Sequence, residues 1–143
     1  MAAYNKFQDF IEQVFLGKHI VGTHVFKLYL SNELPLAADT VKLDIADITA
    51  GNGYTAGGTD AALTEAEASG TLTVTGTSIL WTATGGTIGP FQYAVLYNDT
   101  QTAPADPLVS WWDRGAALTL QDGESFRWKP NNSATTGTVF TAA

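Results

Sequence analysis

Apolar positions recur every second residue over much of this chain, and residues 88–114 are the richest stretch. The alternating set consists of Phe91, Tyr93, Val95 and Tyr97, with Gln92, Ala94 and Leu96 between them. Side chains of a strand alternate between the two faces of a sheet, so this pattern predicts a β-strand. Because Ala94 and Leu96 are apolar as well, both faces are covered, which is typical of a central strand. We therefore place the core around this strand.

Similar short alternating runs continue from residue 70 to the C-terminus, separated by turns rich in Gly, Pro and Asn. About seven to nine short strands of this kind favour a β-sandwich. Abundant Thr fits pleated sheet surfaces. We predict a mainly β fold: an antiparallel, jelly-roll-like β-sandwich over residues 18–143, with no second domain. Residues 39–47 are left open between a helical turn and a strand.

The N-terminal segment has a different period. An apolar stripe at helical spacing is formed by Tyr4, Phe7, Phe10, Ile11, Val14 and Phe15. It predicts one amphipathic helix of about three to four turns within residues 1–17, ended by Gly17. The stripe either packs on the chain's own sheet or docks on another subunit. We expect it to anchor a partner, and deletion of residues 1–16 to leave a folded β domain.

A glycine-rich stretch follows at residues 48–62, with Gly51, Gly53, Gly57 and Gly58 close together. Such spacing predicts a loop with positive backbone φ angles. No Lys-Thr or Lys-Ser follows it, which argues against a phosphate-binding loop. The stretch is either a long ordered loop over one end of the sheet or a contact with a neighbour. For the second case the candidate partner-binding residues are Gly51, Asn52, Gly53 and Tyr54.

Composition narrows the chemistry. The 143 residues have a formal net charge of −7, no Cys and two His, and residues 43–113 lack Lys and Arg. No basic patch is evident to bind nucleic acid, and no apolar run approaches the ~20 residues of a membrane helix. His19 and His24 are too few for a zinc site, and we expect both to be solvated. We assign no catalytic residue, no metal ligand and no cofactor.

One cluster has the composition of a sugar-binding site. Trp111, Trp112 and Asp113 follow one another on a predicted strand. Aromatic faces stack on sugar rings, and a carboxylate accepts hydrogen bonds from hydroxyl groups. Adjacent residues of a strand point to opposite faces, so we expect at least one of the two tryptophans in the core.

Several blocks in the same order resemble a family of small virion structural proteins of tailed bacteriophages. The blocks are LYLSN (28–32), ITAGNGYT (48–55), WTATGG (81–86), IGPF (88–91), YAVLYNDT (93–100), WWD (111–113) and GESF (123–126). The resemblance spans roughly residues 4–128. After GESF this chain reads Arg127-Trp128-Lys129-Pro130, where family members continue with alternating acidic and apolar residues.

The resemblance implies a non-enzymatic part of a phage particle. Our first interpretation is a capsid decoration (cement) protein on the capsid surface, which stabilises the head by subunit contacts. Its partners would be other virion proteins, above all the major capsid protein, and further copies of itself as a homo-oligomer. The alternatives are a tail, neck or fibre-attachment structural protein, or a carbohydrate-binding module on the virion surface.

Overall fold

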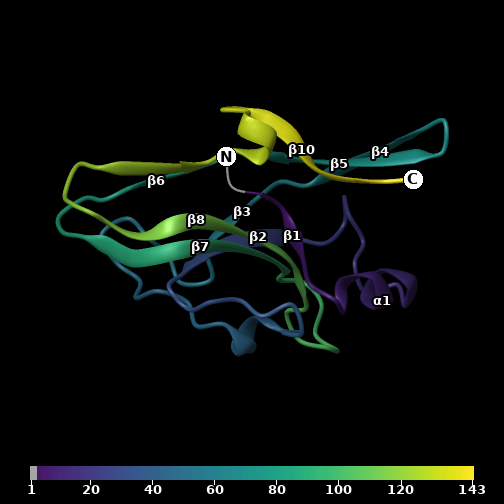
Figure 1. The fold of residues 1–143 in the computed structure, drawn as a ribbon, viewed down its shortest axis with the longest axis horizontal. Helices are drawn as coiled ribbons and strands as arrows, with labels where there is room; N and C mark the ends of the chain where they lie inside the picture. The colour runs from purple at the N-terminus through teal and green to yellow at the C-terminus, as the bar shows by residue number, and fades with distance from the viewer. Residues whose placement is uncertain (1–2) are drawn as a thin grey trace.

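A five-stranded antiparallel sheet forms one layer of the molecule in the computed structural model, which describes residues 3–143 (Figure 1). Its strands, in spatial order, are β1 (Asn5–Lys6), β8 (Leu108–Leu120), β7 (Ile88–Asn98), β2 (Phe26–Ser31) and β3 (Thr59–Asp60). As predicted, the aromatic-rich strand β7 is central, because it is hydrogen-bonded to β2 on one side and β8 on the other.

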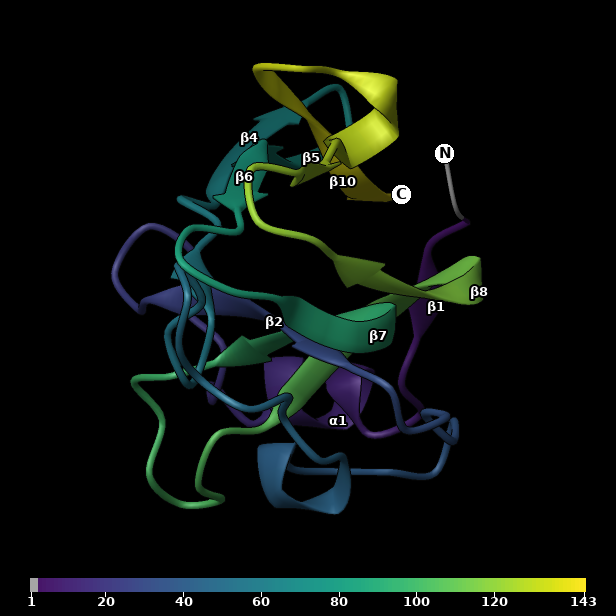
Figure 2. The same cartoon turned by 90° about the vertical axis from the view of Figure 1, so that its left-hand side faces the viewer.

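The second layer lies over this sheet and consists of two smaller antiparallel sheets (Figure 2). The three-stranded sheet contains β10 (Thr136–Ala142), β5 (Thr71–Thr77) and β4 (Thr64–Ala68), and the two-stranded sheet contains β6 (Ile79–Thr82) and β9 (Ser125–Trp128). This confirms the predicted mainly β fold with antiparallel sheets and one small N-terminal helix.

The strand pairs are nested, which explains the jelly-roll-like character. β5 pairs with β10, β6 with β9 and β7 with β8. The chain therefore runs out through β5, β6 and β7 and returns through β8, β9 and β10, as a long hairpin folded into two layers does. β9 is followed by a short 3-10 turn, η2 (Pro130–Asn132), before β10 begins.

Strand β7 is buried on both faces, but its alternation is interrupted. Phe91 packs into the main core between the layers, whereas Tyr93, Val95 and Tyr97 form a second cluster on the outer face of the sheet. The expectation that Phe91 shares a face with these three is therefore wrong. The pairing register of β7 with β8 shifts between Phe91 and Tyr93, and such a bulge turns the residues beyond it to the other face.

The segment between β2 and β3 covers the outer cluster. Its 3-10 turn, η1 (Lys42–Asp44), settles the open choice for residues 39–47 in favour of a helical turn. The Tyr29 hydroxyl donates to the Ile45 carbonyl at 3.0 Å, and the Ser31 hydroxyl donates to the Ala46 carbonyl at 2.6 Å. These bonds hold the segment against the sheet, so that the outer face is also dry.

The N-terminal helix is shorter than predicted. α1 (Phe10–Phe15) has six residues, and β1 precedes it as a strand paired with β8. Phe7, between the two elements, is 0 % exposed and packs against Trp111 with ring centroids 4.6 Å apart. The helix does not extend to the N-terminus because the backbone of residues 5 and 6 pairs with the open edge of β8. Residues 1–17 therefore do not form a separate helical unit, and their described part belongs to the sandwich.

Candidate functional site

Several large apolar side chains on α1 and the turn that follows it are exposed. We call this surface the α1 patch; its five members are Ile11, Val14, Phe15, Leu16 and Ile20. Phe15 is 86 % exposed, which is unusual for so large an apolar side chain. Beside the patch, an apolar groove of about 340 Å³ separates α1 from the three-stranded sheet. Members of the patch line it together with Phe10, Leu72 and Phe140.

The six residues predicted to bind a partner divide into two groups. Ile11, Val14 and Phe15 are exposed in the α1 patch, whereas Phe7 and Phe10 are buried in the chain's own core. The Tyr4 ring is half-buried, and its centroid lies 5.7 Å from that of Trp112 and 5.7 Å from that of Phe140. Burial raises the pKa of Tyr4 to about 12, so it stays neutral. Half of the predicted set is therefore packed within this molecule.

The other two members of the patch, Leu16 and Ile20, were not among the predicted residues. The apolar pattern does continue past the end of the helix, since Leu16, Ile20 and Val21 follow within a few residues. Gly17 ends α1 with a positive φ of 73°, and the chain beyond it turns back toward β2. The patch is thus made by the helix together with the turn that follows it.

A buried amide supports this turn from below. Asn98, at the end of β7, is 0 % exposed and donates from Nδ2 to the Lys18 carbonyl at 3.0 Å. The same nitrogen lies 2.9 Å from Nδ1 of His24 and 3.3 Å from Nδ1 of His19. The prediction that both histidines are solvated is wrong, because each is half-buried.

His19 is the more constrained of the two histidines. Its ring lies between Phe10 and Phe26, with centroids 5.2 and 5.7 Å away. Burial, and secondarily the neighbouring His24, lowers the pKa of His19 from 6.5 to about 4. A neutral imidazole is therefore part of the structure that holds the α1 patch in place.

The glycine-rich loop is packed against its own domain. Gly51 and Tyr54 bond reciprocally through their backbones, with N···O distances of 2.8 and 3.1 Å, and Asn52 and Gly53 form the turn between them. A Cβ on Gly53 would lie 2.4 Å from the Thr82 carbonyl oxygen, so only glycine permits this approach. Asn52 is exposed, but its side-chain Nδ2 donates to the Thr87 carbonyl at 3.0 Å.

Tyr54 closes the loop from inside the core. Its hydroxyl donates to Asp47 and accepts from the Leu30 N–H at 3.0 Å. The second Asp47 oxygen accepts from the Gly57 N–H at 2.7 Å, and Tyr97 donates to the Gly57 carbonyl at 2.8 Å. Of the two roles considered for residues 48–62, the contacts fit the long ordered loop.

The proposed sugar-binding triplet is split by its strand. Trp112 is buried in the main core, whereas Trp111 lies on the outer face against Phe7. Asp113 is exposed and accepts from Gln92 Nε2 at 2.9 Å. The expectation that at least one tryptophan lies in the core is confirmed. The three side chains do not form one sugar-stacking surface.

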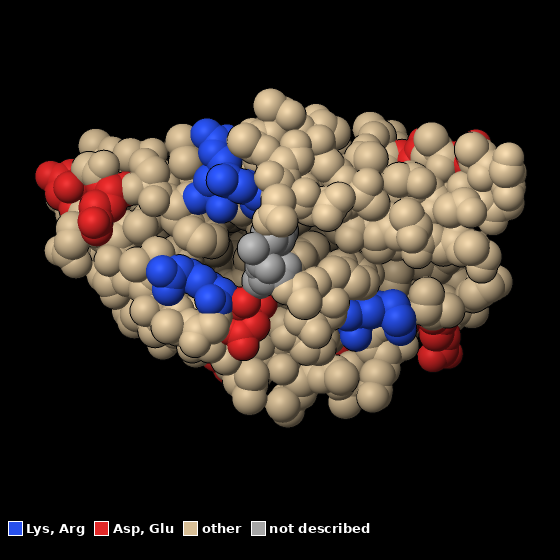
Figure 3. Space-filling view, turned by 45° about the horizontal axis from the view of Figure 1, so that its top comes forward, with Lys and Arg blue, Asp and Glu red and all other residues tan. Residues whose placement is uncertain are grey.

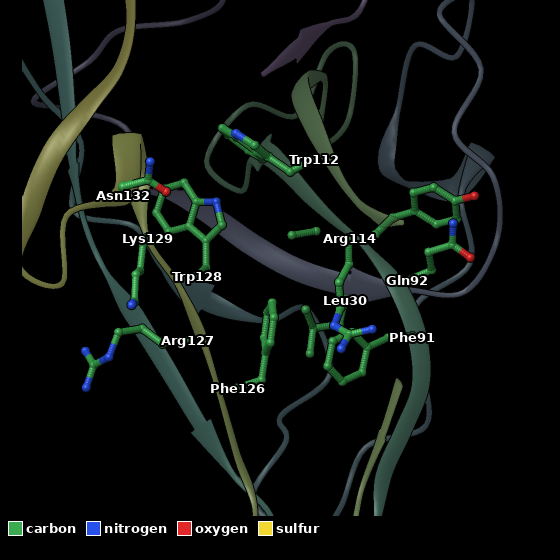
Figure 4. A pocket seen from close by; sticks show the side chains of 12 residues that line it. Leu30, Phe91, Gln92, Trp112, Arg114, Phe126, Arg127, Trp128, Lys129 and Asn132 are labelled. Carbon is green, nitrogen blue, oxygen red and sulfur yellow. The ribbon is translucent and has the colours of Figure 1, made fainter. Parts of the chain in front are cut away.

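Trp112 instead contributes to a cleft between the two layers, which the sequence did not reveal. The cleft has a volume of about 350 Å³. Its walls are Phe91 and Trp112 of the five-stranded sheet and Phe126 and Trp128 of β9 (Figure 4). Three cationic side chains also line it, and they are Arg114, Arg127 and Lys129. We call this site the basic cleft. Figure 3 shows Lys and Arg in separate groups on one face of the molecule, with Asp or Glu beside some of them.

Other classes of site find little support. In the part of the chain that the structure describes, no group of three or more His, Cys, Asp or Glu residues could hold a metal ion. No helix within residues 3–143 is both long and apolar enough to cross a membrane. No protein-family model, curated protein or solved structure matches this chain. The features that bear on function are the α1 patch, the basic cleft and the sequence resemblance.

Proposed function

We propose that this protein is a non-enzymatic structural protein of a bacteriophage virion, and specifically a capsid decoration (cement) protein. The observation that carries the proposal is the α1 patch, where Phe15 and four further apolar side chains face solvent beside an apolar groove. Contiguous exposed apolar patches of this kind mark protein–protein contact sites. The resemblance of several sequence blocks, in the same order, to phage virion proteins is the reason for proposing a phage particle.

The energetics of the patch favour a partner. Each large apolar side chain that moves from water into an interface contributes about 1.5–3 kcal/mol. A central aromatic residue commonly dominates the affinity of an interface, and Phe15 has the size and exposure for that role. The partners we propose are the major capsid protein and further copies of this chain on the capsid surface, with no nucleic acid and no membrane contact.

A paired substitution tests the patch directly. Phe15→Asp should abolish incorporation into particles. It should leave the free energy of unfolding within about 0.5 kcal/mol of wild type, because the side chain touches little of its own domain. The matched control is Leu43→Asp, since Leu43 is 93 % exposed and lies on η1, which contributes no residue to the patch. Full incorporation of the Phe15→Asp variant at unchanged stability would refute the patch as the attachment surface.

Counting copies per particle tests the specific role. A decoration protein spread over the head should be present in several hundred copies per virion, measured by quantitative mass spectrometry. A count of about six or about twelve would match the ring symmetry of a neck or tail instead. That result would leave the virion assignment in place and replace the head role by the tail, neck or fibre-attachment alternative.

A further inference from the structure

The basic cleft has features that the proposed structural role does not use. Two aromatic pairs cross from one layer to the other. Trp112 meets Trp128 with ring centroids 5.1 Å apart, and Phe91 meets Phe126 at 5.0 Å, both edge-to-face. The cleft lies among these rings, in a site whose walls are fixed by packing (Figure 4). Its volume of about 350 Å³ falls within the range of small-molecule sites, which begins near 300 Å³.

Charge is concentrated at this cleft against the trend of the whole chain. The protein has a net charge of −7 and seven Lys and Arg residues, three of which line the cleft. Among residues 3–143, none of these three pairs with a carboxylate; the two ion pairs formed are Lys27–Asp99 and Lys42–Asp47. The lining includes no Asp or Glu. Unpaired cations beside apolar walls favour an anionic ligand.

The cations differ in how freely they can reach a ligand. Arg127 Nη1 donates to the Ser78 hydroxyl at 3.1 Å, which holds its guanidinium on the β6 side. Arg114 comes from β8, on the opposite side of the cleft, and among residues 3–143 its side chain bonds only to the Ala116 carbonyl, at 2.9 Å. In Figure 4 Arg114 runs along one side of the cleft toward Leu30 and Phe91, while Lys129 lies on the opposite side, next to Trp128 and Arg127. Arg114 is therefore the best-placed partner for an anion.

The wall of β9 supplies a second recognition element. Phe126 and Trp128 are two residues apart and so project from the same face of the strand. Trp128 is 3 % exposed, and its Nε1 has no hydrogen-bond partner within the described residues. This nitrogen has almost no accessible surface, so it is a reporter next to the cleft and not itself a ligand contact.

From these features we infer that the basic cleft binds a carboxylated six-membered ring. The ring lies against Phe126, which is half-buried, and the carboxylate pairs with Arg114, whose planar guanidinium matches carboxylate geometry in two parallel hydrogen bonds. A neutral sugar fits poorly, because its hydroxyl groups need acceptors and no carboxylate lines the cleft. The side-chain amides in the lining are those of Gln92 and Asn132. Two sources share this chemistry: an acidic sugar of a glycan and a free aromatic acid.

Three small probes test the inference by NMR on the full-length protein. They are methyl glucuronide, methyl glucoside, which lacks the carboxylate, and benzoate. The reporter is the indole N–H resonance of Trp128. Saturable shifts with glucuronide and none with glucoside support an acidic sugar. Shifts with benzoate alone retain the carboxylated ring and assign the aromatic source. Equal binding of glucoside and glucuronide, or no binding of either acid, would overturn the inference.

A variant pair ties binding to the proposed contact. Arg114→Gln should weaken binding of the acid by about 10-fold or more, the usual loss for a charge-assisted pair. Lys18→Gln, which removes a cation outside the cleft, should leave the affinity unchanged. Both side chains lie at least partly in solvent, so we expect both variants to fold. The dispersion of their amide resonances checks this. Unchanged affinity in Arg114→Gln, or binding of an acidic hexapeptide in place of both ring acids, would refute the site as described.

Discussion

Mild acid should destabilise this protein through one residue, His19. In the folded state His19 lies between two phenyl rings and its pKa is lowered from 6.5 to about 4 by burial first and by His24 second. The unfolded chain binds a proton below about pH 6.5, whereas the folded chain does not until about pH 4. Protonation of His19 therefore costs no unfolding free energy above pH 6.5. The cost grows as the pH falls from 6.5 to about 4, and below pH 4 it has reached its full size.

The size of the effect follows from the shift. One pKa unit corresponds to about 1.4 kcal/mol, so a shift from 6.5 to about 4 is worth about 3 kcal/mol at full protonation. At about pH 5 the loss reaches about 2 kcal/mol, a substantial part of the ~5–15 kcal/mol that stabilises a typical domain. The measurement is urea unfolding at pH 7, 6 and 5. This range avoids most of the titration of ordinary carboxylates, near pH 4.

The acid experiment has a matched control. His19→Phe retains a ring between Phe10 and Phe26 and removes the titrating group, so its unfolding free energy should vary little from pH 7 to pH 5. His24→Gln keeps His19 and should retain most of the acid sensitivity, because burial is the larger cause of the shift. A wild-type free energy that changes by less than about 0.5 kcal/mol would refute the reasoning, as would an equal loss in His19→Phe.

Three further predictions concern the fold. Gly58→Ala should cost more than about 3 kcal/mol in urea unfolding, because its Cβ would lie 1.9 Å from the Leu28 carbonyl oxygen. Gly115→Ala, also at positive φ but in open space, should cost only about 1–2 kcal/mol. Tyr54→Phe should lower the free energy of unfolding by about 1–3 kcal/mol, since it removes the hydroxyl and with it two hydrogen bonds that fix the glycine-rich loop. Deletion of residues 1–16 should abolish the cooperative thermal melt; a cooperative melt after deletion would return the segment to the role of a detachable anchor.

The sequence predicted the sheet well because its signal is local. Alternation in residues 91–97 was sufficient to identify the central strand β7 and its burial on both faces. The exact faces were less predictable, since the bulge between Phe91 and Tyr93 leaves no mark in the apolar pattern. A bulge depends on how two strands align, and that alignment is a property of the pair rather than of either segment.

The candidate sites were harder to predict because they are assembled from distant segments. The basic cleft joins Arg114 of β8 with Arg127 and Trp128 of β9, which face one another only after the hairpin folds into two layers. The helical stripe had the opposite problem. Its helical period holds at Phe10 and Val14, but Phe7 lies outside the helix and is buried by Trp111, a contact across about a hundred residues.

The two candidate sites can fail independently, which makes the proposals separable. α1 lies at one end of the molecule, and the β6 strand that pairs with β9 lies toward the other end (Figure 1). His19 packs beneath the α1 patch and does not line the basic cleft. Acid that protonates His19 should therefore weaken attachment through the patch before it affects binding in the cleft. If particle attachment and cleft binding instead declined together between pH 7 and pH 5, the loss would reflect global unfolding and not a loosened patch.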